Sequence, residues 1–108
     1  MNRLFVYGTL APGKPNEHVL AELDGSWEPA TIRGTLHEAG WGAALGYPVI
    51  VLDDEGELIQ GQIFRSSQLA NYWDVIDTFE GVAYKRVLAE VKLDNGSKIS
   101  AFVYVLNE

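Results

Sequence analysis

The sequence predicts a mixed α/β fold, in which a small curled or barrel-like β-sheet is flanked by two or more short helices. Residues 85–93 and 97–106 both alternate polar and apolar side chains. The turn residues Asp94, Asn95 and Gly96 lie between them, which is the pattern of a β-hairpin. Ahead of the hairpin, short strand-like runs are interspersed with two stretches of helical spacing. This order of strands and helices is the basis of the fold prediction.

Four further strands are expected before the hairpin, because short apolar or alternating runs end there at turn residues. Their ranges are 4–6, 31–36, 49–52 and 58–64. A turn over residues 53–57, centred on Gly56, connects the last two. Residues 38–48 are rich in glycine and alanine and fit neither periodicity, so we expect a surface loop that borders any pocket.

Two helices are expected from apolar spacing on one face. The first covers residues 15–23 and places Val19, Leu20 and Leu23 on one side. The second covers residues 67–80, with Ser66 or Ser67 as its N-cap and Gly81 at its C-terminal end. Its apolar stripe should pack inward; the stripe consists of Leu69, Tyr72, Trp73 and Ile76.

The register of the hairpin depends on the length of its loop. A two-residue turn would mix polar and apolar residues on each face. A three-residue loop with Gly96 in a left-handed conformation keeps one face apolar. This register predicts five cross-strand pairs: Val91 with Ile99, Ala89 with Ala101, Val87 with Val103, Arg86 with Tyr104 and Leu88 with Phe102.

Composition limits what the chain can bind. The 108 residues include 47% hydrophobic side chains, which fits one compact domain over residues 1–108. Fifteen acidic residues against eight basic ones give a net charge of −7, which opposes binding to nucleic acid or to anionic membranes. Neither a signal-peptide pattern nor an apolar run of about 18 residues is present, so a cytoplasmic location is expected.

The residue types also exclude several kinds of site. The chain has no cysteine, which rules out a thiolate nucleophile, a disulfide framework and a cysteine-ligated zinc. His18 and His37 are too few and too far apart to suggest a metal site. The three tryptophans suit a core or an interface equally, so the oligomeric state is left open.

The first candidate site is the loop after the first strand, where Tyr7, Gly8, Thr9 and Leu10 precede the breakers Pro12, Gly13 and Pro15. A glycine here lets neighbouring backbone amides point at an acceptor, so the loop can hold a negative oxygen. The alternative is an ordinary turn after a strand.

The second candidate is Glu80. It follows Leu69 by eleven residues, about three turns at about 3.6 residues per turn, and so continues the apolar stripe. A carboxyl at the edge of such a stripe has its pKa raised by desolvation, which suits proton transfer. Alternatively, the helix frays before Gly81 and Glu80 turns to solvent. Asp74 and Asp77 are expected to project away from the stripe into solvent.

Taken together, several segments resemble the γ-glutamylcyclotransferase family, in particular its small bacterial members and the γ-glutamylamine cyclotransferases. The resemblance covers essentially the whole chain. It is carried by the opening at residues 5–10, the pairs Pro15-Asn16 and Tyr47-Pro48, the run Asp77 to Gly81, and Tyr84 and Arg86.

The resemblance implies a mixed α/β fold built on a small β-barrel, a substrate-binding loop at Tyr7, Gly8, Thr9 and Leu10, and catalytic Glu80. The implied reaction converts a γ-glutamyl amine or dipeptide to 5-oxoproline and needs no cofactor. Tyr84 and Arg86 follow Glu80 closely enough either to bind the same small-molecule substrate or simply to begin the hairpin strand. Tyr104, opposite Arg86, either contacts substrate or fills the sheet face. A non-catalytic ligand-binding or interaction domain on the same fold is the alternative.

Overall fold

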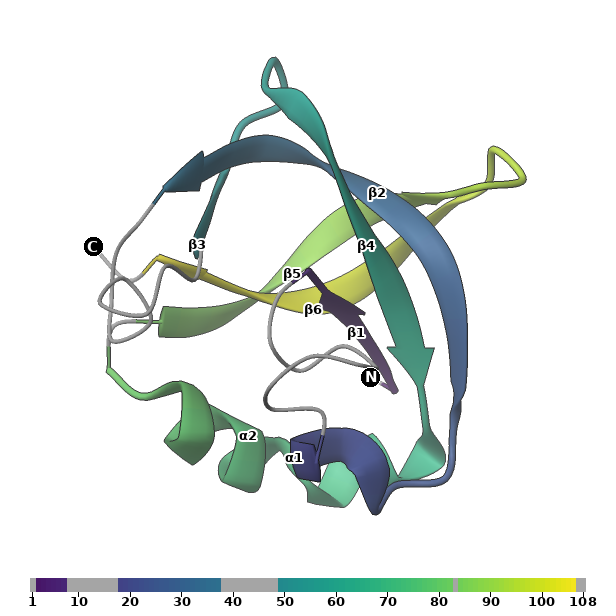
Figure 1. Ribbon diagram of the computed structural model, residues 1–108, viewed down its shortest axis with the longest axis vertical. Coiled ribbons are helices and arrows are strands. Elements are labelled where there is room, and N and C mark those ends of the chain that lie inside the picture. Colours follow the sequence, from purple (N-terminus) through teal and green to yellow (C-terminus); the bar gives the residue numbers. More distant parts are fainter. Residues whose placement is uncertain (1, 8–17, 38–48, 83, 107–108) are drawn as a thin grey trace.

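The computed structural model describes residues 2–7, 18–37, 49–82 and 84–106. Within these ranges, five strands close into a small barrel in the order β1, β4, β2, β5, β6 and back to β1 (Figure 1). All neighbouring pairs are antiparallel except β6 and β1, which are parallel. The barrel strands are β1 (Arg3–Val6), β2 (Ser26–His37), β4 (Glu57–Arg65), β5 (Tyr84–Leu93) and β6 (Lys98–Leu106). The predicted barrel-like sheet is therefore confirmed.

A sixth strand, β3 (Val49–Leu52), pairs with β2 on one side and with β6 on the other. Its bounds agree with the prediction. The β2 strand begins at Ser26, five residues earlier than predicted, because residues 26–30 pair with residues 61–65 of β4 although they do not alternate cleanly. Pairing with β4 determines where β2 begins, and the hydrophobic pattern of residues 26–30 alone does not reveal it.

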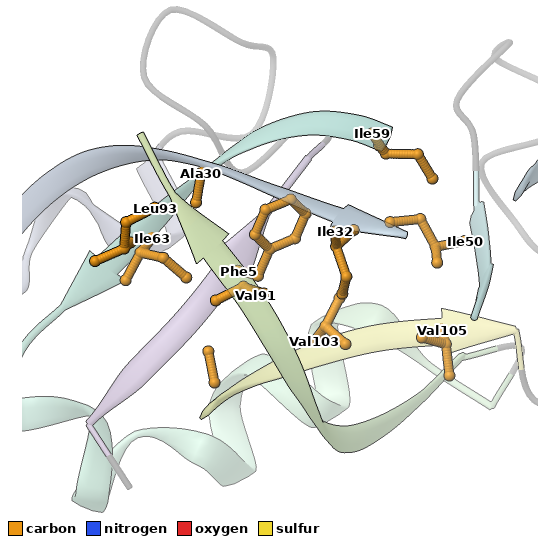
Figure 2. Packing of buried hydrophobic residues seen from close by; sticks show 11 residues of the cluster. Phe5, Ala30, Ile32, Ile50, Ile59, Ile63, Val91, Leu93, Val103 and Val105 are labelled. Atoms are coloured by element: carbon orange, nitrogen blue, oxygen red, sulfur yellow. The ribbon is translucent and has the colours of Figure 1, made fainter. Parts of the chain in front are cut away.

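The barrel interior is a single apolar cluster, shown in Figure 2. Because side chains alternate across a strand, neighbouring residues on β1 and on β6 belong to two different clusters. Phe5 fills the interior while Leu4 packs outside, and Val103 lies inside while Tyr104 lies outside. The helices pack against the outer cluster. The outer cluster joins Leu4, Val6, Val19, Leu20, Phe64, Leu69, Ile76 and Tyr104.

The hairpin of β5 and β6 has the predicted register. All five predicted pairs are present, including Arg86 with Tyr104 and Val91 with Ile99. Gly96 adopts the predicted left-handed conformation with φ of 89°. The Leu93 amide donates to the Ser97 carbonyl at 2.8 Å, which closes the three-residue loop.

The helices gather at one side of the barrel, at the bottom of Figure 1, and α1 (His18–Ala21) buries Val19 and Leu20. The prediction of one continuous helix over 67–80 is wrong. A 3₁₀ helix, η2 (Ser67–Asn71), is followed by α2 (Trp73–Glu80), and the break lies at Tyr72. Asn71 and Tyr72 have low helix propensity, and the Tyr72 amide closes a tight turn on the Leu69 carbonyl.

The predicted helix boundaries are correct at both ends of this region. The Ser66 hydroxyl accepts a hydrogen bond from the Gln68 amide at 3.1 Å, so Ser66 caps η2. Gly81 ends α2 with φ of 80°. Among the described residues, no helix is long and apolar enough to cross a membrane.

Candidate functional site

Glu80 is the last residue of α2. Ile76, four residues earlier on the same face, is fully buried. The helix therefore turns this face, and Glu80 with it, toward the barrel. Burial raises the pKa of the Glu80 carboxyl from 4.5 to about 7. At neutral pH such a group is present in both protonation states, so it can accept and donate a proton.

Tyr7 follows β1, and its hydroxyl is engaged on both sides. It donates to the Tyr104 carbonyl at 2.7 Å and accepts from the Ile50 amide at 3.1 Å. Burial raises the pKa of the Tyr7 hydroxyl, and the charges of Glu80 and Tyr84 raise it further. Glu80 of α2 and Tyr84 of β5 are thus near enough to Tyr7, just after β1, for their charges to act on its hydroxyl.

Asp77 lies one turn before Glu80, and 41% of its side-chain surface is exposed, so the expectation that it projects toward solvent holds only in part. Its Oδ1 accepts a hydrogen bond from the Tyr104 hydroxyl at 2.6 Å and lies 3.3 Å from Arg86 Nε. Burial raises the pKa of the Tyr104 hydroxyl, and its hydrogen bond to Asp77 raises it further. Asp74 is exposed, as expected.

Arg86 lies on β5, opposite Tyr104 on β6. Besides its ion pair with Asp77, its guanidinium lies over the rings of Trp73 and Phe102, 4.5 and 4.8 Å from their centroids. The guanidinium is therefore held by an anion and by two aromatic faces. This arrangement fastens the start of β5 to α2.

Of the predicted loop, only Tyr7 is described; Gly8, Thr9 and Leu10 lie outside the described residues, as does the predicted loop at 38–48. Two surface hollows are lined by described residues, one beside the start of β1 and one between β2 and β5. Glu80 lines neither. In the described part of the chain, no three His, Asp or Glu side chains gather into a metal site.

Sequence reasoning missed the role of Asp77 as an acceptor. The helical stripe alone places Asp77 off the apolar face, and its partner Tyr104 is 27 residues away on β6. The available signal was the hairpin register, which sets Arg86 across from Tyr104 and so places a cation beside a phenol. That pair lies next to the helix that carries Glu80.

Comparison with known proteins identifies the family. The profile of the family described as gamma-glutamyl cyclotransferase, AIG2-like, matches residues 4–108. The chain belongs to this family. The predicted resemblance is thereby confirmed, and the partly buried Glu80 lies within the part of the chain that matches the family.

Individual relatives agree with the family assignment. YkqA of Bacillus subtilis (strain 168) is 34% identical over 106 residues, which is 97% of this chain and 35% of YkqA. The chain thus spans about a third of that relative. The crystal structure of YkqA superposes with a TM-score of 0.75 at 32% identity, covering 98% of this chain and 36% of YkqA. An AIG2-like protein of Mus musculus has the same fold, with a TM-score of 0.72 at 24% identity over 97% of this chain and 76% of its own.

Proposed function

We propose that the chain is a cyclotransferase that converts a γ-glutamyl amine or γ-glutamyl dipeptide to 5-oxoproline and the free amine or amino acid. The observation that carries this proposal is the Glu80 carboxyl, which burial brings to a pKa of about 7 within a gamma-glutamyl cyclotransferase-family domain. A carboxyl with an ordinary pKa would be ionised at neutral pH and would be a poor proton donor. The family supports the γ-glutamyl substrate class, and the raised pKa of Glu80 supports its proposed role in proton transfer.

The proposed reaction is an intramolecular aminolysis. The neutral α-amine of the substrate attacks the γ-carbonyl carbon, and Glu80 takes one proton from the amine nitrogen as the bond forms. The new carbon–nitrogen bond closes the five-membered ring. Glu80 then gives its proton to the departing nitrogen as the original amide bond breaks. Protons and bonds balance without any cofactor.

The remaining roles are binding and orientation. The substrate must be folded so that its own amine and carbonyl meet, which a tight pocket achieves by fixing their geometry. We assign the developing oxyanion to backbone amides of the loop at Tyr7, Gly8, Thr9 and Leu10, where each donor contributes roughly 3 to 4 kcal/mol in known cases. The Tyr7 hydroxyl already donates its hydrogen bond to the Tyr104 carbonyl, so Tyr7 would serve through its backbone or its ring.

Tyr84 and Arg86, at the start of β5, are the proposed side-chain contacts to the substrate. Tyr84 is close enough to Tyr7 to influence the pKa of its hydroxyl. Arg86 is oriented by Asp77 and by the rings of Trp73 and Phe102. The loop at 38–48 is the proposed determinant of the leaving amine.

The test is release of 5-oxoproline from a panel of γ-glutamyl dipeptides and γ-glutamylamines, including γ-glutamyl-ε-lysine. We expect turnover of at least one class, and the preferred leaving group then names the substrate. Absence of product from every compound, with protein shown to be folded by circular dichroism, would contradict the proposal and favour a non-catalytic binding domain.

A further inference from the structure

Asp77 joins the helix that carries Glu80 to two strands of the barrel. Its Oδ1 accepts from the Tyr104 hydroxyl of β6 at 2.6 Å and pairs with Arg86 Nε of β5 at 3.3 Å. Residues three apart on a helix are neighbours on its surface, so the attachment lies one turn from Glu80. Only Thr78 and Phe79 separate Asp77 from Glu80, the last residue of α2.

Arg86 extends this attachment to the beginning of α2. Its guanidinium lies over the ring of Trp73, the first residue of the helix, and over Phe102 of β6. Trp73 and Phe102 also pack edge to face, with ring centroids 5.1 Å apart. The two turns of α2 are therefore fixed against the same pair of strands by one connected set of side chains.

Tyr104 carries the connection across to the strand that leads into the predicted substrate loop. Its hydroxyl binds Asp77, while its backbone carbonyl accepts from the Tyr7 hydroxyl at 2.7 Å. Tyr104 of β6 is thus hydrogen-bonded both to α2 and to Tyr7. These are the two elements that carry the predicted catalytic carboxyl and the predicted binding loop.

We propose that Asp77 is a positioning residue for Glu80: by accepting the Tyr104 hydroxyl and pairing with Arg86, it fixes the last turn of α2 so that the Glu80 carboxyl faces Tyr7. The kinetic part of this inference rests on the proposed cyclotransferase function, whereas its titration part does not. A role in stability alone is the weaker reading, because Asp77 is partly exposed, with 41% of its side-chain surface accessible, and exposed ion pairs contribute little to stability.

The first experiment follows the Glu80 carboxyl by NMR in protein with carboxyl-labelled glutamate. The charge of Glu80 acts on the hydroxyls of Tyr7, which follows β1, and of Tyr104 on β6, and Asp77 and Arg86 lie beside Tyr104. Both Asp77→Ala and Asp77→Asn remove a nearby negative charge, but only Asn keeps an acceptor oxygen for Tyr104. Their difference therefore isolates geometry from charge.

We expect the Glu80 pKa to stay close to about 7 in Asp77→Asn and to fall toward its ordinary value of 4.5 in Asp77→Ala, where the carboxyl turns to solvent. The matched control is Asp74→Ala, which removes an exposed carboxyl one turn earlier on the same helix and should leave the titration unchanged. Equal Glu80 pKa values in Asp77→Ala and wild type would overturn the inference, whether or not the protein turns over a substrate.

The second experiment measures kcat and KM for 5-oxoproline release. We expect Asp77→Ala to lower kcat by roughly 10- to 100-fold with little change in KM, because misplacement of a reacting group costs rate. Asp77→Asn should recover most of kcat, and Tyr104→Phe should lie between the two. A rise in KM with unchanged kcat would overturn the inference, since Asp77 would then act only through a substrate contact of Arg86. No turnover by wild type would refute the proposed function and leave the titration to decide the inference.

Discussion

Protonation of the Glu80 carboxyl affects the stability of the fold. Burial favours its uncharged form, so its pKa is about 7 in the folded protein against 4.5 as the ordinary value. Between these two pH values the folded state binds more protons than the unfolded state. The free energy of unfolding therefore falls as pH rises through this window. The stabilising contribution of Glu80 is fully lost above about pH 7.

Glu80→Gln tests this linkage without changing the size of the side chain. We expect the substitution to raise the free energy of unfolding by roughly 1 to 3 kcal/mol at pH 8 and by much less at pH 5. Urea unfolding at both pH values measures it. The same change in stability at pH 5 and pH 8 would show that Glu80 is not held in a desolvated position.

At the scale of elements, Gly81 determines where α2 ends. Its φ of 80° is strained for any other residue, although a methyl group there would meet no atom within 4 Å. Gly96 in the hairpin loop is its matched control, with φ of 89° and equally open space.

We expect Gly81→Ala and Gly96→Ala to destabilise the protein by a similar amount, about 1 kcal/mol each. Only Gly81→Ala should also lower turnover, because only Gly81 directly follows Glu80. Thermal unfolding together with 5-oxoproline release measures both effects. Equal turnover in the two variants would contradict the view that the end of α2 orients the proposed catalytic carboxyl of Glu80.

These elements also show what local sequence reveals. Alternation on both strands and the glycine at position 96 determine the hairpin register, since only one loop length keeps an apolar face. The break at Tyr72 was missed because Leu69 and Ile76 have the spacing of one continuous helical face. Two consecutive short helices also bury both residues, so the spacing does not distinguish the two cases. The partners of Asp77 were missed because they come from β5 and β6, which the stripe on α2 does not describe.

At the scale of the whole molecule, the site is assembled from both ends of the chain. Tyr7 and Tyr104 are 97 residues apart in sequence and joined by one hydrogen bond. The order of strands around the barrel depends on such long-range pairings, so hydrophobic patterns did not specify it. The family resemblance indicated the barrel. It also implied a catalytic role for Glu80, which stays a prediction, and burial of that carboxyl raises its pKa to about 7.

Closure of the barrel requires β1 and β4 to approach closely at Gly61. A methyl group there would lie 2.5 Å from the buried Phe5 ring and 2.6 Å from the Val6 carbonyl oxygen. We expect Gly61→Ala to destabilise the protein by about 1 to 3 kcal/mol, because the interior has no room to yield. The exposed neighbour Gln60→Ala, on the same strand, should change stability by much less. Urea unfolding measures the stability of both variants. Equal losses of stability would contradict the close approach of β1 and β4 at Gly61.

The most direct test of the account compares 5-oxoproline release by wild type and Glu80→Gln on the preferred γ-glutamyl substrate at pH 7. Glu90→Gln serves as the control, because that carboxyl is exposed on β5. We expect Glu80→Gln to lower kcat by about 10²- to 10⁴-fold, the range for loss of a general acid–base group, with Glu90→Gln unchanged. Near-native turnover by folded Glu80→Gln would contradict the assignment of Glu80 as the proton shuttle.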